Sequence, residues 1–509
     1  MADGRVLLLL LAVAVLAGAT NPPNILFFAA DDVGWNDIGW NNPDIKTPNL
    51  DHYAKNGIIL NQSYVQPLCS PSRSAWLSGR FPYHTGMQHL VILPAQPYGL
   101  PLNLTTLPNL MKDAGYATHM VGKWHQGFCS WEYTPTHRGF DSFYGYFNGQ
   151  VDYYTHKVDI PLFGNGIDFR DNEKAVTNQN GTYSTGLYTK RAQQIITEHN
   201  KTKPLFLYFA SQNVHMPLEV PQSYIDMYSN IKNKNRRLTS AMVTAMDDSF
   251  GAVVNTLEEQ GMMDNTLIVF TSDNGGPVYA GGNNWPLRGS KATMWEGGTR
   301  AAAYVYGSML KKAQFSYHGM MHAVDWFPTM AEIAGAKLPI YELDGMSMWN
   351  AIRNNATSPR TEFVYNMNVK GHRRGRAAIR VNDWKLVVGP DGLFSGWYPV
   401  PTSSSHNPTD FDLYHAMMAS EEDEELGTNE IDSVFTMEQD ARATKYQLFN
   451  VIDDPTEHHD LSKEQPDVLK MMIGRYSELA KTEVKAMNPN NDPKANPKYY
   501  NGVWTPGWC

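Results

Sequence analysis

The sequence predicts an α/β fold: a mostly parallel sheet sandwiched by helices, followed by a smaller C-terminal α+β domain that contains an antiparallel sheet. Three observations predict it. Short apolar runs end abruptly in polar residues, helical patterns lie between these runs, and the character of the sequence changes near residue 370. The chain has 509 residues, which is more than one hydrophobic core of about 250–300 residues accommodates, so we expect more than one domain.

The apolar runs are predicted to be strands. They cover residues 24–30, 204–210 and 265–271. Continuous runs of this length are typical of strands buried on both faces of a parallel sheet. Ligands of such sheets bind at the carboxyl ends of the strands. We therefore expect the polar residues that follow these runs to form the functional site.

Helical patterns complete the first part of the chain. Helices are predicted from Thr47–Pro48 to Gly57, over 187–199 and over 241–260. The C-terminal part is predicted to hold a hairpin over 377–388, a strand from Tyr446, a helix over 466–482 and a solvated acidic loop over 401–440. These patterns divide the chain into a predicted signal peptide (1–19), a larger α/β domain (20–374) and a smaller C-terminal domain (375–509).

The N-terminus predicts the secretory pathway. The apolar run VLLLLLAVAVLAGA is shorter than the ~20 residues of a membrane span and ends in small residues, which favours a cleaved signal peptide. No later segment predicts a membrane span. Five sequons agree with this route, at Asn61, Asn103, Asn180, Asn200 and Asn355. A net charge of −9 argues against nonspecific nucleic-acid binding.

The chain has only 3 cysteines, so at least one is unpaired. Cys69 lies in the polar segment LCSPSRSAWLSGR, where Pro71 is expected to exclude a helix and to display the thiol on an exposed bend. Cys129 and Cys509 could pair and tie the C-terminus to the N-terminal half, and we predict this disulfide.

Four oxygen-bearing residues follow two of the predicted strands: Asp31, Asp32, Asp273 and Asn274. Adjacent carboxylates repel each other unless a cation lies between them, and oxygen ligands suit Ca²⁺ or Mg²⁺. The alternative is that both pairs are simply turns. Their shared position at strand ends favours the metal site.

Basic side chains and histidines provide further candidates. Arg73, Lys123 and Lys291 together would form an anion pocket, although each alone could be a surface charge. His125 and His215 are candidate acids or bases, and the alternative for both is a loop histidine bonded to the backbone.

A cation, an anion pocket and two histidines suit hydrolysis of a sulfate or phosphate ester. A soft thiolate is a poor ligand for Ca²⁺, so Cys69 fits only if its sulfur is replaced.

These motifs resemble the sulfatase family. LCSPSRSAWLSGR is similar to the signature that directs conversion of cysteine to Cα-formylglycine, with Ser78 where threonine is usual. NILFFAADDVGW before it and GKWHQG, SQNVHMP, TSDNGG and GSKATMWEGGTR after it occur in the family's order, with Gln126 where leucine is usual. RGFDSFYGYFNGQVDYYTH and GVWTPGW are most similar to the arylsulfatase B-like (N-acetylgalactosamine-4-sulfatase) branch.

The resemblance implies an alkaline-phosphatase-like fold, one Ca²⁺ per chain and formylglycine at position 69. It implies that the metal ligands are Asp31, Asp32, the modified Cys69, Asp273 and Asn274. Arg73 and Lys123 would hold the formylglycine hydrate, and His125 would be the base that acts on it. His215 and Lys291 would bind sulfate and assist the leaving oxygen.

The resemblance also implies partners and a location. The substrate would be a sulfated carbohydrate or an aryl sulfate, with 4-sulfated N-acetylgalactosamine favoured. A formylglycine-generating enzyme would act during maturation, and the product would be lysosomal or secreted. The alternatives are a phosphate or phosphonate ester hydrolase of the same superfamily and an inactive glycan-binding relative.

Overall fold

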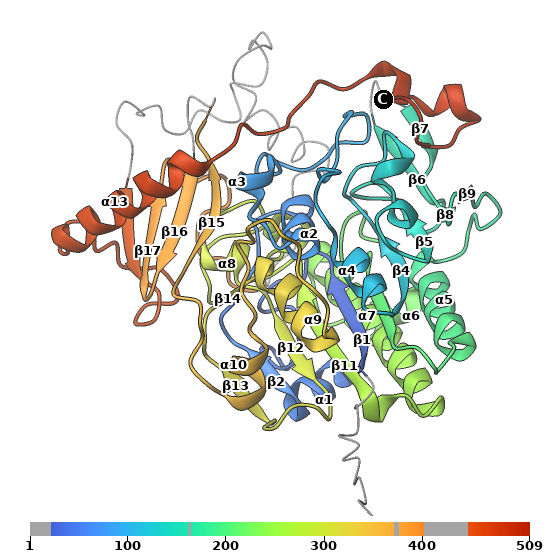
Figure 1. Cartoon of the computed structure of the whole chain (residues 1–509), viewed down its shortest axis with the longest axis horizontal. Coiled ribbons are helices and arrows are strands. Elements are labelled where there is room, and N and C mark those ends of the chain that lie inside the picture. The colour runs from blue at the N-terminus through green and yellow to red at the C-terminus, as the bar shows by residue number, and fades with distance from the viewer. Residues whose placement is uncertain (1–21, 161–163, 371–375, 402–445) are drawn as a thin grey trace, which may run out of the picture.

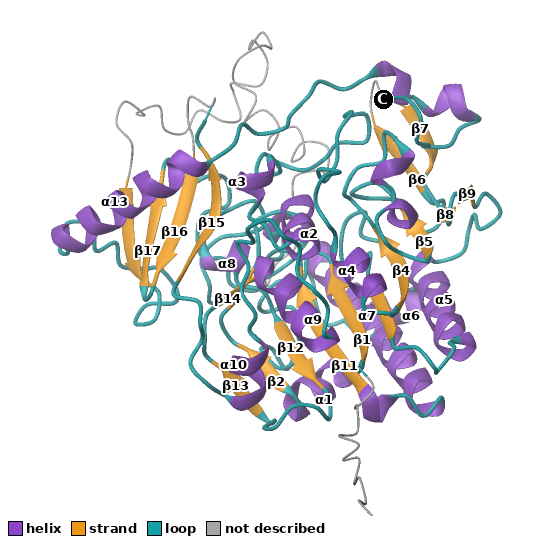
Figure 2. Ribbon diagram, in the orientation of Figure 1, coloured by secondary structure: helices purple, strands orange, loops and turns teal. Residues whose placement is uncertain are grey.

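The computed structural model describes residues 22–160, 164–370, 376–401 and 446–509 (Figure 1). The predicted signal peptide and the acidic stretch after residue 401 lie outside these ranges. The centre of the fold is a ten-stranded sheet with the order β13-β2-β12-β11-β1-β10-β4-β5-β8-β9. Its middle strands, β11, β1, β10, β4 and β5, run parallel. Helices cover both faces (Figure 2), which confirms the predicted α/β class.

The large sheet consists of β1 (Asn24–Ala30), β2 (Ile58–Leu60), β4 (Ala117–Lys123), β5 (Ser142–Tyr146), β8 (Arg170–Asp171), β9 (Lys174–Ala175), β10 (Leu205–Ala210), β11 (Thr266–Ser272), β12 (Ala303–Tyr306) and β13 (Phe315–Tyr317). Two small pairs are β3 (Ser63–Tyr64) with β14 (Met321–His322) and β6 (Lys157–Ile160) with β7 (Gly164–Ile167). The α-helices before residue 360 are α1 (Pro48–Asn56), α2 (Cys69–Ser78), α3 (Pro82–Thr85), α4 (Leu107–Asp113), α5 (Ser184–Glu198), α6 (Gln222–Asp226), α7 (Lys234–Glu259), α8 (Glu296–Thr299), α9 (Trp326–Ala334) and α10 (Trp349–Asn354).

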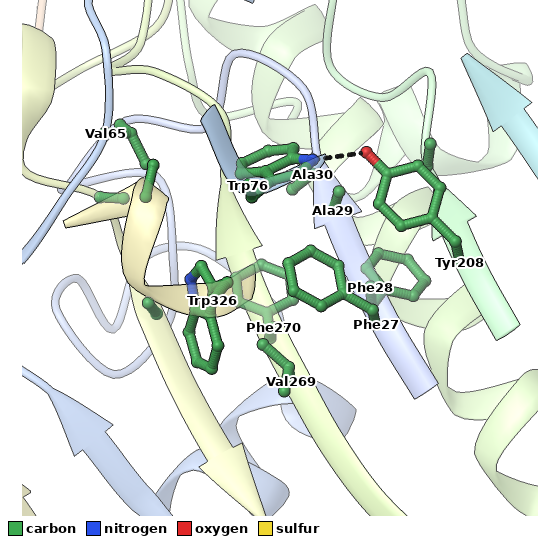
Figure 3. Packing of buried hydrophobic residues seen from close by; sticks show 14 of the residues in the cluster. Phe27, Phe28, Ala29, Ala30, Val65, Trp76, Tyr208, Val269, Phe270 and Trp326 are labelled. Atoms are coloured by element: carbon green, nitrogen blue, oxygen red, sulfur yellow. Dashed lines mark hydrogen bonds between the residues drawn. The ribbon is translucent and has the colours of Figure 1, made fainter. Parts of the chain in front are cut away.

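Strand β1 is buried on both faces, as its uninterrupted apolar sequence predicts. Phe27 packs against Trp76 of α2 and Trp326 of α9 on one face (Figure 3). The next residue, Phe28, points to the other face and contacts Phe250 of α7 at 5.4 Å between ring centroids. Neighbouring residues of a strand point to opposite faces, so one apolar run supplies both halves of the core.

The predicted helices are present, but two of them begin earlier than their apolar patterns. α7 starts at Lys234 because the side chain of Asn233 accepts a hydrogen bond from the backbone N–H of Arg236, which caps the helix. α5 starts at Ser184, three residues before the predicted start at 187. Polar first turns carry little hydrophobic periodicity, so the apolar patterns begin later than the helices themselves.

Our expectation for the segment around Cys69 was wrong. Helix α2 begins at Cys69 and runs through Pro71 to Ser78, and all of its residues are buried. Proline is tolerated in a first helical turn because the N–H groups there have no partner within the helix. The helix ends at Gly79, whose φ of 68° places it in the left-handed region that glycine adopts without strain. Cys69 is therefore not on an exposed bend; it is 1% exposed.

The C-terminal part forms an antiparallel sheet of β15 (Glu362–Asn368), β16 (Arg376–Val381), β17 (Trp384–Val388) and β18 (Tyr446–Asn450), with α13 (Pro466–Thr482) against it. The hairpin, the last strand and the helix are those that the sequence predicts. Strand β15, which precedes the predicted boundary at 374/375, pairs with β16, which follows it. The boundary itself stays a prediction.

A disulfide and a buried ionic network, among other contacts, join the C-terminal part to the rest of the chain. The predicted disulfide between Cys129 and Cys509 is present. In the network, Lys385 of β17 is fully buried and its Nζ lies 3.1 Å from Glu296 Oε1 and 2.7 Å from Glu457 Oε1. The Glu457 carboxylate also accepts a hydrogen bond from the backbone N–H of Glu296. Because these three residues come from distant segments, this buried network connects the C-terminal sheet to the start of α8.

Candidate active site

The polar residues that follow the central strands meet at one edge of the sheet. Asp31 and Asp32 follow β1, Asp273 and Asn274 follow β11, and His215 lies in the loop after β10. Because these strands are parallel and adjacent, their carboxyl ends bring the loops together. Potential ligand atoms of Asp31, Asp32, Cys69 and His215 lie within 4.8 Å of one another. The structure therefore brings these polar residues together at one edge of the sheet.

The acidic residues of the site are buried and partly without partners. Asp31, Asp32, Asp273 and Asn274 are at most 1% exposed. Burial first, and then the nearby Asp273 carboxylate, raise the pKa of Asp31 to about 8. The Oδ1 atoms of Asp31 and Asn274 have no hydrogen-bond partner among the described residues. Buried oxygens without donors are costly, and these two, beside two more carboxylates, fit a hard cation such as Ca²⁺.

Three cations surround the carboxylates. Arg73 Nη2 lies 2.8 Å from Asp273 Oδ2, Lys123 Nζ lies 2.6 Å from Asp31 Oδ2, and Lys291 Nζ lies 2.7 Å from Asp32 Oδ1. Burial is the largest single effect and opposes the charge of Lys291, but Asp32 and other nearby groups together outweigh it, and the pKa of the lysine is raised well above its usual value. Because these three basic side chains are buried and paired, the alternative interpretation of each as a surface charge is wrong. A bound dication would leave the site electropositive and suited to an anion.

His125 has a defined tautomer. Its Nε2 lies 3.0 Å from the carbonyl oxygen of Ile92, which can only accept, so Nε2 carries the proton. Its Nδ1 is buried and has no partner among the described residues, so it presents a lone pair. Burial, and then Lys123 and Arg73, lower the pKa of His125 well below its usual value. The imidazole is thus held neutral, as a base must be before it accepts a proton.

His215 lies at the more open end of the site. Its Nδ1 lies 2.8 Å from the carbonyl oxygen of Met216, and its Nε2 lies 3.8 Å from Asp32 Oδ2. The side chains of His215 and Lys291 are 11% and 7% exposed, whereas those of Arg73 and Lys123 are fully buried. An incoming molecule would therefore meet His215 and Lys291 first.

The amino terminus of α2 holds Cys69 at the centre of the site. The partial positive charge of a helix N-terminus favours an anion there. The next residue, Ser70, is fixed on both sides: its hydroxyl accepts from the N–H of Ile92, and its carbonyl accepts from Nε2 of Gln126. The same Gln126 nitrogen donates to the carbonyl of His125.

The sequence did not identify Ile92 or Ser70 as site residues. Both act mainly through backbone groups or local contacts, which no residue-type pattern predicts. The positive φ angles of Asp32 (62°) and His125 (55°) were also not predicted. Such angles cost about 1–3 kcal/mol in a non-glycine residue and are typical of functional sites.

Comparison with known proteins agrees with this geometry. Residues 23–336 match the Sulfatase family model. The chain is 40% identical to mouse (Mus musculus) arylsulfatase J over 96% of its own length and 80% of the relative's. It is 30% identical to human (Homo sapiens) arylsulfatase A over 74% of this chain and 77% of that one. It is 33% identical to mouse N-acetylgalactosamine-6-sulfatase over 72% and 73% of the two chains.

Among solved structures, the fold is similar to that of Ps i-CgsB in complex with k-i-k-neocarrahexaose. The TM-score is 0.74, with 29% identity over 92% of this chain and 94% of that one. The phosphonate monoester hydrolase of Agrobacterium radiobacter shares the fold alone, at 14% identity over 91% of this chain and 96% of that one, with a TM-score of 0.59. The chain belongs to the sulfatase family, and it is a hydrolase of sulfuric esters with an alkaline-phosphatase-like fold. Among the described residues, no helix is long and apolar enough to cross a membrane.

Proposed function

We propose that this sulfatase removes sulfate from sulfated sugars, with 4-sulfated N-acetylgalactosamine of glycosaminoglycans as the preferred unit. The observation that carries the proposal is the convergence of Cys69 with Asp31, Asp32 and His215 at one sheet edge. The relative named N-acetylgalactosamine-6-sulfatase favours a sulfated sugar, and the neighbour in complex with k-i-k-neocarrahexaose favours a carbohydrate. Similarity of the C-terminal motif GVWTPGW to the arylsulfatase B-like branch favours the 4-sulfate.

One Ca²⁺ would be held by the oxygens of Asp31, Asp32, Asp273 and Asn274, together with the modified residue 69. The unpartnered Oδ1 atoms of Asp31 and Asn274 support this ligand set. When bound, the cation would supply electrostatic stabilisation for the sulfate oxygens and for a nucleophilic oxygen.

Cys69 would become Cα-formylglycine, whose hydrated form supplies one hydroxyl to attack sulfur and a second hydroxyl through which sulfate is released. Arg73 and Lys123 would orient that group from the buried side of the site. His125 would accept a proton at Nδ1, the atom that the Ile92 carbonyl leaves free. His215 and Lys291, at the open end, would bind the sulfate and protonate the leaving oxygen.

The proposal also includes maturation and location. The predicted signal peptide and sequons support transit through the secretory pathway, to the lysosome or to the outside of the cell. A formylglycine-generating enzyme would act on the chain along that route.

The mass of the peptide that contains residue 69 tests the proposal. The chain would be expressed in a eukaryotic secretory cell that matures a control sulfatase, and we expect a formylglycine mass. The purified protein would then be assayed on 4-sulfated and 6-sulfated N-acetylgalactosamine, with phosphate esters as the contrast. Cys69→Ser is the matched control, since serine cannot provide a second hydroxyl on the same carbon. An unmodified cysteine beside a matured control sulfatase would contradict the proposal, and so would preference for the phosphate esters.

A further inference from the structure

The loop of residues 389–398, which follows β17, crosses from the C-terminal sheet to the catalytic part of the chain. We call it the aromatic loop, after Phe394, Trp397 and Tyr398. Its backbone carbonyls accept hydrogen bonds from the segment that leads to Lys291. Ser395 O accepts from Arg288 Nε at 2.7 Å, and Gly396 O accepts from the N–H of Gly289 at 2.8 Å. The loop is therefore fixed only a few residues from a site lysine.

The far side of the aromatic loop is anchored as well. The indole N–H of Trp397 donates to the carbonyl of Thr456 at 2.6 Å, and its ring stacks on His458 at 4.2 Å. The guanidinium of Arg288 lies 4.7 Å from the centre of the same indole. These contacts give the Trp397 side chain a structural role, which is to anchor the loop. None of them involves the ring of Phe394.

Phe394 lies in a small apolar cluster beside the catalytic groups. Its ring centroid is 5.1 Å from that of Tyr279, and Met216 packs against the same cluster. Met216 directly follows His215, and the N–H of Val278, next to Tyr279, donates to the hydroxyl of Ser290, next to Lys291, at 3.2 Å. The cluster therefore adjoins both residues at the open end of the site.

Two properties separate Phe394 from an ordinary packing residue. It is only partly buried, although it is a large aromatic residue. Its φ is 56°, in the left-handed region that disfavours a bulky side chain. A strained, partly exposed aromatic residue next to a catalytic site indicates a functional constraint on that side chain.

We propose that Phe394, supported by Tyr279 and Met216, forms an apolar wall that packs against the ring of the sulfated substrate. The ring that carries the ester oxygen would enter beside His215 and Lys291 and place its apolar face on Phe394. Phe394 is then a specificity-determining residue supplied by the C-terminal part of the chain. This inference rests on the proposed function of the site.

The variant Phe394→Gly tests the wall, because glycine adopts the positive φ without strain but has no ring. We expect KM for sulfated N-acetylgalactosamine to rise about threefold to tenfold, with kcat within about twofold of wild type and an unfolding temperature that is not lowered. Phe394→Tyr, which keeps the ring, is expected to retain the wild-type KM. A residue with a merely structural role would lower the unfolding temperature on truncation to glycine.

The matched control is Trp397→Phe, on the same loop. It removes the hydrogen bond to Thr456 O and is expected to lower the unfolding temperature without changing KM. An unchanged KM in Phe394→Gly would overturn the inference. An equal rise of KM in Trp397→Phe would also overturn it, because the rise in KM would then come from a displaced loop and not from loss of the Phe394 ring. If the wild type itself hydrolyses no sulfated sugar, the proposed function of the site fails before the wall is tested.

Discussion

Two nitrogens of Arg73 donate to the same carboxylate oxygen of Asp273, Nε at 3.0 Å and Nη2 at 2.8 Å. Both side chains are fully buried, and removal of one partner of such a pair costs about 3–5 kcal/mol. We expect Asp273→Ala to lower the unfolding temperature and to lose both bound Ca²⁺ and activity. Equilibrium dialysis with Ca²⁺, together with an aryl sulfate assay, measures these losses. Retention of either bound Ca²⁺ or activity would contradict the metal assignment.

His125→Ala is expected to reduce steady-state kcat by about 10²–10⁴-fold, since it removes the proposed base. If His125 acts only on the release of sulfate, the first turnover should still occur. Rapid-mixing kinetics with a chromogenic aryl sulfate would then show a burst of the alcohol product followed by very slow turnover. Equal slowing of the burst and of the steady state would assign His125 to the first step instead.

The buried network of Lys385, Glu296 and Glu457 predicts a pH dependence of stability. Burial first, and also the nearby Glu296 carboxylate, raise the pKa of Glu457 from 4.5 to about 7, although Lys385 opposes the shift. The folded state therefore binds this proton more tightly than the unfolded state. The stabilising contribution of Glu457 is complete below about pH 4.5 and is lost as the pH rises through about 7.

Comparison of the wild type with Glu457→Gln isolates this effect. We expect the difference in unfolding free energy, wild type minus variant, to fall by about 1–3 kcal/mol between pH 4.5 and 7. Urea unfolding at several pH values measures it, and the exposed Glu464→Gln provides a control that should show no such trend. A difference that is constant with pH would show that Glu457 titrates normally.

Cys509→Ser removes the disulfide to Cys129 and is expected to lower the free energy of unfolding by about 2–5 kcal/mol. The last residues of the chain would then also lose the hydrogen bonds that Gly507 and Trp508 donate to the Cys129 carbonyl. Thermal unfolding without reductant measures the change. An identical unfolding temperature for the two proteins would show that the C-terminal segment is held by noncovalent contacts alone.

The sequence predicted the central strands well because their apolar runs are buried on both faces and lack alternation. It missed β4, where Thr118, His119, Gly122 and Lys123 interrupt the apolar pattern although the strand is central to the sheet. It also misjudged α2, since the rule for the residue before proline weakens in a first helical turn. Local rules fail where tertiary packing imposes the conformation.

The candidate site was predictable to the extent that it consists of charged side chains at strand ends. The convergence of Asp31, Asp32, Cys69 and His215 follows from parallel topology, and the motifs that resemble the sulfatase family identified the same residues. The Ile92 carbonyl that fixes the His125 tautomer could not be predicted, because any residue supplies a carbonyl. Phe394 was missed because it lies more than 300 positions after Cys69 and joins the site only through folding.

The burial of Cys69 sets an order of events in the life of the chain. Once α2 has packed, the thiol is 1% exposed, which leaves a modifying enzyme no access to it. If Cys69 is converted to an aldehyde, as proposed, the oxidation would therefore precede or accompany the closure of the first half of the fold. A chain that folded before this step would remain a stable but unmodified protein. The yield of active enzyme would then depend on the relative rates of modification and folding, and slower folding or more modifying enzyme during synthesis would increase it.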